Sequence, residues 1–300
     1  MRFSYTIREE HNGHTIEQVL KEEFKISSQL LKNIKLYGSI LVNGRKQWTK
    51  DSVHNGDILE AGWDFAGKEA GHIICDSIPI LYQDDCFLIV VKPSNLCVHP
   101  SKGHGYDSLI TRLNGGNGLH VVTRLDKDTS GLVLLAKNGY WHNQLSNIEI
   151  IKRYYGVVEG KLEPAQSLVD APIQRESEDS VRRIVHSQGK RAITAYKVLD
   201  YLSEVDLSVV GFQLFTGRCH QIRVHTSYLG HPLVGDNLYG SIIESTEGQR
   251  LVCGKLQFIH PRDQVLVEVS LPSIGDILWK NGGIKQDVCN KLDNINTYIL

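Results

Sequence analysis

The first sixty residues combine strand-like and helix-like hydrophobic patterns. FSYTI (3–7) alternates hydrophobic and polar residues as a strand does, whereas HTIEQVLKEEF (14–24) has its hydrophobic residues at helical spacing. Within the second segment, Thr15 and Gln18 form a capping-box pattern, which is typical of a helix start. A second short helix is expected in SQLLKNIKLYG (28–38), which begins at a serine and ends at a glycine.

Turn residues complete this N-terminal unit. SILVNGRKQ (39–47) is typical of a strand that enters an Asn-Gly hairpin turn, and HNGDILE (54–60) is typical of a second turn entering a strand. We therefore expect a small helix-helix-hairpin domain over residues 1–62. A linker is expected over residues 63–75, because AGWDFAGKEAGHIIC (61–75) is rich in Gly and Ala and has no clear period.

Basic side chains gather at two places in this unit. Lys32 and Lys35 fall on the second expected helix, and Arg45 and Lys46 at the hairpin tip. Charge alone favours a solvated face, while the alternative is contact with phosphates of a nucleic acid.

From residue 76 to residue 300, short strand patterns recur between Gly, Pro and Asn turns. Helical segments such as GYWHNQLSNIEI (139–150) intervene without strict strand-helix alternation. This order predicts an α+β domain with a mostly antiparallel mixed sheet.

Composition indicates the class of protein and the cellular compartment. A chain of 300 residues with 41% hydrophobic and 22% charged residues is typical of a globular protein, and a net charge of -1 restricts any nucleic-acid binding to local basic patches. The six scattered cysteines indicate free thiols in a reducing compartment. No signal-peptide pattern opens the chain and no apolar run has bilayer length, so we expect a cytoplasmic protein free of the membrane. We also expect a monomer.

Asp126 is the most unusual carboxylate in the chain. It lies in TRLDKDTSG (123–131), a loop leading into the apolar strand pattern GLVLLAK (131–137). One interpretation is a turn cap for the amides of Thr129 and Ser130. The other interpretation is a catalytic role, which depends on residues 150–160 and 215–240.

Two further segments contain candidate chemistry. IIKRYYGVVEG (150–160) places Lys152 and Tyr154 on one side of an expected strand, where a tyrosine is also common as plain packing. In FTGRCHQIRVHTSYLGHPLVGDNLYG (215–240), a cluster from Arg218 to His225 is interleaved with Ile222 and Val224, which we interpret as a strand with one face in the core. The cluster does not suit zinc, since no Cys or carboxylate stands at ligand distance. An arginine buried there needs a carboxylate, and Asp126 is the candidate.

The chain resembles a known family. RLDKDTSGLVLLAKN, KRYYGVVEG, TGRCHQIRVHTSYLGHPLVGDNLYG and LQFIHP occur in the order found in RluA-type pseudouridine synthases, and the resemblance runs from about residue 78 to residue 272. The N-terminal unit resembles the alpha-L RNA-binding motif, a common companion of that family. The resemblance implies the pseudouridine synthase fold, an RNA substrate (ribosomal RNA favoured over transfer RNA), and no metal or cofactor.

The resemblance also implies roles for individual residues. Asp126 corresponds to the catalytic aspartate, Tyr154 to the tyrosine that lies against the target base, and Arg223 to the basic residue that pairs with the aspartate. Leu256 corresponds to an apolar residue that lines the pocket. Arg124 would help to fill the space left by an extruded nucleotide. Further phosphate contacts are expected from a basic hairpin, with a solvated turn as the alternative; its residues are Arg182, Arg183, Lys190 and Arg191.

Three positions depart from the family pattern, namely Thr123 in place of histidine, Val91 in place of asparagine, and Val252-Cys253-Gly254 in place of Leu-His-Ala. None of them touches Asp126, Tyr154 or Arg223, so we expect them to bear on RNA contacts and substrate choice rather than on activity. The residues leave open whether Asp126 acts as a nucleophile or as a base. A catalytically silent RNA-binding protein and a hydrolase using Ser130 are the alternatives, although the chain has no Gly-x-Ser-x-Gly motif.

Overall fold

The structure is a computed structural model. It describes residues 2–26, 28, 31, 34–35, 39–62, 78–99, 107–114, 118–243, 245–246 and 248–278. The expected linker (63–75) and Lys32, with much of the second expected helix, lie outside the described residues.

Residues 2–62 form a four-stranded antiparallel sheet in the order β1-β4-β2-β3. The predicted capping box is present, because the Thr15 side chain accepts a hydrogen bond from the Gln18 amide at the start of α1. The helix buries Ile16, Val19 and Leu20 in a core that belongs to this unit. Its elements are β1 (Arg2–Thr6), the 3-10 helix η1 (Glu9–His11), α1 (Ile16–Phe24), β2 (Ser39–Val42), β3 (Arg45–Lys46) and β4 (Ile58–Gly62).

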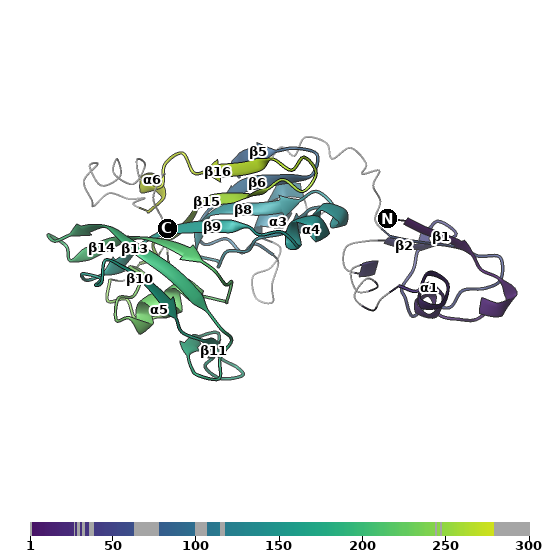
Figure 1. Cartoon of the computed structure of the whole chain (residues 1–300), viewed down its shortest axis with the longest axis horizontal. Helices are drawn as coiled ribbons and strands as arrows, with labels where there is room; N and C mark the ends of the chain where they lie inside the picture. The colour runs from purple at the N-terminus through teal and green to yellow at the C-terminus, as the bar shows by residue number, and fades with distance from the viewer. Residues whose placement is uncertain are drawn as a thin grey trace.

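Residues 78–278 form a larger, mostly antiparallel sheet, in agreement with the predicted α+β class. Its strands lie in the order β10-β13-β14-β9-β15-β8-β6-β5, with β16 beside β15 and β7 beside β8. Figure 1 shows β5, β6 and β16 at one end of this sheet and β10, β13 and β14 at the other, where α5 also lies. In this described part of the chain, the pairing of β15 with β8 is the one parallel pair.

The bounds of these elements follow the chain. The strands are β5 (Ile80–Gln83), β6 (Phe87–Lys92), β7 (His120–Val121), β8 (Ser130–Ala136), β9 (Ile151–Glu159), β10 (Gln166–Asp170), β11 (Ile173–Arg175), β12 (Arg183–Val185), β13 (Ile193–Leu202), β14 (Leu207–Leu214), β15 (Leu251–Ile259) and β16 (Leu266–Ser270). The helices are α3 (Leu109–Asn114), α4 (Gly139–Ser146), α5 (Gln221–Tyr228) and α6 (Gly275–Leu278). The strands β11 and β12 pair as a hairpin, with Arg183 in β12, while Lys190 follows β12 and bridges Ile173. Among the described residues, no helix has both the length and the apolar character needed to span a membrane.

The loop that holds Asp126 is fixed where β8 begins and pairs in parallel with β15. Gly131 has φ +111°, and a Cβ there would lie 2.3 Å from the backbone oxygen of Cys253. Only glycine tolerates both this backbone conformation and this close approach. The backbone conformation at this position therefore explains the glycine of the Thr-Ser-Gly turn. All residues of β8 are buried.

The interpretation of residues 218–225 as a strand is wrong, because this segment enters the helix α5 (Gln221–Tyr228). The alternation of polar and apolar residues arises because the helix is buried on several sides, and Gln221 to Thr226 are all buried. The inward polar side chains have partners: Gln221 donates to the Ile193 carbonyl, and His225 contacts Thr194 Oγ1 at 2.8 Å. Polar partners in a crowded interior, rather than one solvated face, explain the pattern.

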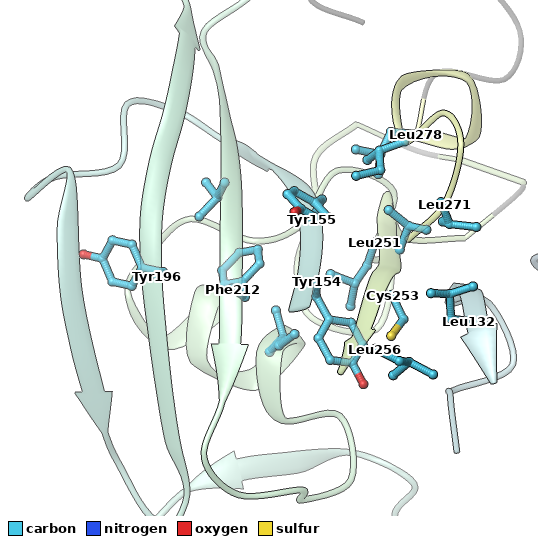
Figure 2. Close-up of a cluster of buried hydrophobic side chains, with 14 of the residues drawn as sticks. Leu132, Tyr154, Tyr155, Tyr196, Phe212, Leu251, Cys253, Leu256, Leu271 and Leu278 are labelled. Carbon is cyan, nitrogen blue, oxygen red and sulfur yellow. The ribbon is translucent and has the colours of Figure 1, made fainter. Parts of the chain in front are cut away.

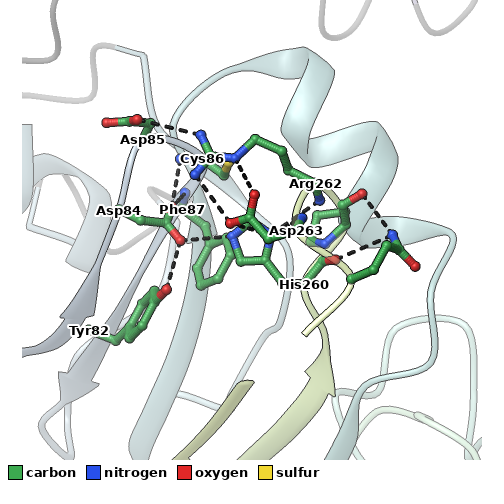
Figure 3. A network of polar contacts seen from close by, with 10 residues as sticks. Tyr82, Asp84, Asp85, Cys86, Phe87, His260, Arg262 and Asp263 are labelled. Carbon is green, nitrogen blue, oxygen red and sulfur yellow. Dashed lines mark hydrogen bonds and ion pairs between the residues drawn. The ribbon is translucent and has the colours of Figure 1, made fainter. Parts of the chain in front are cut away.

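The LQFIHP segment ends in a buried polar network at the far end of the sheet (Figure 3). His260 Nε2 lies 2.9 Å from Asp84 Oδ2, while His260 Nδ1 accepts from the amides of Arg262 and Asp263. Asp84 also accepts from the Cys86 amide and the Tyr82 hydroxyl. This network links β15 to the β5–β6 hairpin and holds that end of the sheet together.

Candidate active site

Two cavities share Asp126 in their walls. The first, of about 530 Å³, is also lined by Tyr154, Lys152 and Arg183. The second, of about 890 Å³, is also lined by Asp236 and Lys127. The residues common to both are Arg124, Leu125, Asp126, Cys219, His220 and Arg223. The shared wall holds Asp126 and Arg223, and the smaller cavity adds Tyr154, so that this cavity is lined by all three residues that the sequence nominates for chemistry.

Asp126 reaches this wall from the loop before β8, with its side chain 28% exposed. Its carboxylate Oδ2 lies 3.6 Å from Arg223 Nη1, the ion pair that the sequence analysis expected. The amide of Thr129 donates to the main-chain oxygen of Asp126. The turn is therefore closed by the backbone, and the carboxylate is left to face the cavities.

Arg223 has a second, closer carboxylate, which the sequence analysis missed. Its Nε and Nη2 donate to the two oxygens of Asp236 at 2.7 and 2.8 Å, and the Asp236 side chain is fully buried. Burial alone lowers the pKa of Arg223, but the hydrogen bonds to Asp236 raise it above its ordinary value. A bidentate pair of this kind fixes the guanidinium plane. Asp236 therefore orients the cation that faces Asp126.

Tyr239 packs against the Arg223 guanidinium, and His220 contacts Tyr239. The Arg223 guanidinium lies 4.9 Å from the Tyr239 ring centroid, within the range of a cation–π contact. The Tyr239 hydroxyl lies 2.8 Å from His220 Nδ1 and accepts from the Arg183 amide. Burial lowers the pKa of His220, which keeps its ring neutral at neutral pH. The positive charge next to Asp126 thus comes from Arg223.

Tyr154 lies on β9 with only 5% of its surface exposed, and it lines the smaller cavity. Figure 2 shows its ring beside Cys253 and Leu256 from the neighbouring strand β15. Burial raises the pKa of Tyr154 well above 10, and Cys253 and Asp126 raise it further. The side chain is therefore a neutral phenol that offers a flat apolar wall near the carboxylate.

Lys92 is a completely buried lysine whose side chain binds the loop that holds Asp126. Its Nζ donates to the carbonyls of Pro93, Leu96 and Lys127 at 2.8 Å each. Burial lowers its pKa to about 8, against weaker opposing effects of Asp128, Cys97 and Asp126. The Lys92 ammonium thereby joins the backbone of residues 93–96 to that of Lys127, which follows Asp126 in the chain.

The smaller cavity has a basic lining. Arg124, Lys152, Arg183 and Arg218 all contribute to it, and among its lining residues Asp126 is the one carboxylate. This distribution favours a polyanionic ligand that presents phosphates around a buried reaction centre.

The other predicted RNA-binding residues lie in varied surroundings. Lys35 Nζ donates to Glu17 at 3.0 Å, and Arg45 and Lys46 are exposed on β3. Arg182 pairs with Glu176 at 3.2 Å and Arg191 lies 3.7 Å from Asp170, while Lys190 forms an isolated bridge with Ile173. Nearby acids partly offset these cations.

Leu256 is fully buried in the main core and is absent from the linings of both cavities. It lies close to Tyr154 and Cys253 in this core (Figure 2). Among the described residues, the three groups of His, Cys, Asp and Glu with metal-ligand spacing lie outside the walls of both cavities.

Comparison with known proteins gives a consistent result. Residues 86–228 match the family model described as RNA pseudouridylate synthase, and residues 3–59 match the model of the RluD ribosomal pseudouridine synthase N-terminal domain. The RNA pseudouridine synthase YjbO of Bacillus subtilis is 37% identical over 257 residues, which cover 81% of this chain and 89% of YjbO. The ribosomal large subunit pseudouridine synthase D of Yersinia pestis is 32% identical, over 87% of this chain and 88% of that protein.

A solved structure shares the fold. The human RNA pseudouridylate synthase domain containing 1 protein superposes with a TM-score of 0.56 at 27% identity. The match covers 66% of this chain and 84% of the human chain.

Proposed function

This chain belongs to the RluA-type RNA pseudouridine synthases, which are isomerases, and we propose that it converts specific uridines of large-subunit ribosomal RNA to pseudouridine through Asp126. The observation that carries the proposal is the shared wall of the two cavities, where Asp126, Arg223 and the cavity of Tyr154 come together.

The reaction breaks the bond between uracil and ribose, turns the base and joins it again through carbon 5. It involves no redox change and no net group transfer, so it requires neither a cofactor nor a metal. The target base must leave its stack before it reaches a buried carboxylate, which costs a few kcal/mol and favours loops or unpaired sites.

Asp126 acts as the charged group at the reaction centre. It either attacks the sugar as a nucleophile or removes a proton from it, and both routes need the ionised carboxylate. The guanidinium of Arg223, held by Asp236, favours that charged form at 3.6 Å.

Tyr154 provides the surface against which the uracil rests while it turns. Its raised pKa keeps the hydroxyl protonated, so the ring contributes contact area rather than a negative charge. Arg124 lines both cavities, and we assign it to fill the space of the displaced nucleotide.

Phosphate contacts supply affinity from outside the reaction centre. The basic lining of the smaller cavity meets the backbone close to the target, and residues 1–62 act as a separate RNA-binding domain through Lys32, Lys35, Arg45 and Lys46. Such contacts position the RNA without reading its sequence. We place the catalytic domain at residues 76–300 and the linker at residues 63–75.

The names of several relatives, ribosomal large subunit pseudouridine synthase D, favour ribosomal RNA over transfer RNA as the substrate. We further propose that the protein works as a monomer in the cytoplasm, in keeping with four free cysteines among the described residues.

Incubation of the purified protein with unmodified large-subunit ribosomal RNA and with unmodified transfer RNA, followed by mapping of pseudouridine, tests this function. We expect discrete new sites in the ribosomal RNA that are also lost from a deletion strain. Modification of transfer RNA alone would refute the choice of substrate, and binding without modification would leave a silent RNA-binding protein.

A further inference from the structure

We propose that residues 2–62 carry a binding site for a divalent cation of the zinc type, formed by His11, His14 and Glu22 with Glu23 as the fourth ligand. The site lies where η1 (Glu9–His11) and the following loop meet the last turn of α1 (Ile16–Phe24). It is separate from the cavities around Asp126, and it is independent of the proposed function.

Three pairs of these ligand atoms already stand at the separations that a small ion requires, and Glu23 joins the group through its contact with His11. His11 Nε2 lies 3.6 Å from Glu22 Oε2 and 3.5 Å from Glu23 Oε1, and His14 Nδ1 lies 3.4 Å from Glu22 Oε2. Nitrogen and oxygen ligands at zinc distances in a tetrahedron are about 3.3–3.6 Å apart. Ligand atoms of His11, His14 and Glu22 all lie within 4.8 Å of one another.

These contacts do not behave as ordinary hydrogen bonds. A charged imidazole that donates to a carboxylate approaches to about 2.7–2.9 Å. The three separations here are longer, and His14 Nδ1 is shielded from solvent while it makes no hydrogen bond. A buried nitrogen without a partner needs an explanation, and a cation between it and Glu22 Oε2 supplies one.

His11 is oriented as ligating histidines are. Its side chain is 7% exposed, and its other ring nitrogen, Nδ1, lies 3.1 Å from the Tyr5 hydroxyl. When Nδ1 donates to Tyr5, Nε2 is left with a free electron pair that points to Glu22 and Glu23. A second partner on the far ring nitrogen commonly fixes the tautomer and orientation of a metal-bound histidine.

A second group with similar residue types shows the contrast. Asp84, Cys86 and His260 also lie within ligand distance of one another. However, His260 Nε2 reaches Asp84 at 2.9 Å, and its Nδ1 accepts from two amides (Figure 3). Hydrogen bonds satisfy that group, so it needs no ion.

An ion at His11 and His14 would join the loop before α1 to the last turn of the helix. Four protein ligands would close the coordination sphere, as in structural zinc sites, whereas three would leave a position for water. The cation would thus stabilise the small N-terminal unit, whose core is small.

The test is equilibrium dialysis of the full chain against Zn²⁺ at low micromolar concentration, with the bound metal measured by mass spectrometry. We expect about one equivalent per chain, at least a tenfold weaker affinity in His14→Gln, and no change in His54→Gln. His14 is suitable because its side chain is 38% exposed and its Nδ1 makes no hydrogen bond, so the variant should fold. His54 is an exposed histidine of the same unit.

Substitution of Co²⁺ identifies the ligands. We expect visible bands of a nitrogen and oxygen site without the intense near-ultraviolet band of cobalt bound to thiolate, which a site built on the cysteines would give. The proposal is overturned if the full chain retains no Zn²⁺, if His14→Gln binds as tightly as the unchanged protein, or if the thiolate band appears.

Discussion

Arg223 binds Asp236 through two hydrogen bonds of 2.7 and 2.8 Å, so that only its Nη1 remains to face Asp126, at 3.6 Å. The arginine is thus held by one carboxylate, fully buried, and directed at another that is partly exposed. The first is structural and the second is available to a substrate. This division explains how a charged group can be fixed close to Asp126 without neutralising it completely.

Asp236→Asn should therefore reduce turnover although Asp126 is unchanged. Loss of one charge from a buried pair leaves the arginine poorly compensated, at a cost of about 3–5 kcal/mol. We expect a lower melting temperature and a kcat reduced by about tenfold or more. Single-turnover assays on protein that remains folded check this. A normal kcat would mean that Asp236 does not position Arg223 for catalysis.

Lys92→Met should loosen the loop of Asp126. The three carbonyls that Lys92 binds would lose their donor in a buried site, at roughly 1–3 kcal/mol for each group left unsatisfied. We expect lower thermal stability together with lower kcat, whereas RNA affinity should change less. If stability falls while kcat is retained, Lys92 supports the fold but not the active loop.

The same lysine predicts a pH dependence. Its pKa is lowered to about 8, so the ammonium with three donors prevails below that pH and the neutral amine with two donors above it. Three carbonyls cannot all be served by two donors, and turnover should fall as the pH rises through about 8. A pH–rate profile should show this fall in the unchanged protein and not in Lys92→Met. A flat profile from pH 7 to pH 9 would contradict the assignment.

Gly131→Ala should destabilise the chain strongly, because the added methyl group would meet the Cys253 backbone at 2.3 Å and the backbone has φ +111°. We expect a loss above about 3 kcal/mol, within the tail of single substitutions. Gly217→Ala is the matched control, since nothing lies within 4 Å of its Cβ position. Chemical denaturation of both variants decides whether the close pairing of β8 and β15 at Gly131 tolerates a side chain.

Arg183→Ala should weaken RNA binding and reduce its dependence on salt. Arg183 lines the smaller cavity, whereas its neighbour Arg182 is already paired with Glu176 at 3.2 Å. A lost phosphate contact lowers the slope of log affinity against log salt by about 1. Titrations at several salt concentrations should show this for Arg183→Ala and a smaller effect for Arg182→Ala. Equal slopes in all three proteins would exclude a phosphate contact at Arg183.

Local signals allowed much of the fold to be predicted from the sequence. The capping box at Thr15, the apolar run that became β8 and the turn residues of the hairpins all act over a few residues. The prediction of a strand for residues 218–225 was wrong, because a helix that is buried on several sides can show the same alternation of polar and apolar residues as a strand. The period of the hydrophobic residues distinguishes a helix from a strand only when one face of the element is exposed to solvent.

The site shows a similar limit. Asp126, Tyr154 and Arg223 stand in motifs that can be recognised along the chain, and the structure places them at one wall. Asp236 was missed because an aspartate after glycine in VGDN is typical of a turn. Lys92 was missed because a lysine is rarely expected in the core. The signal that could have found Asp236 is that a buried arginine needs a buried carboxylate, and Asp236 lies in the same motif as Arg223.

The central claim is that the carboxylate of Asp126 performs the chemistry. Asp126→Asn keeps the size of the side chain and removes its charge, and Asp85→Asn makes the same change at a residue that is 90% exposed and outside both cavities. Single-turnover formation of pseudouridine on ribosomal RNA should be abolished in Asp126→Asn, with RNA affinity retained, and should be normal in Asp85→Asn. Pseudouridine formation by purified Asp126→Asn at the rate of the unchanged protein would contradict the account.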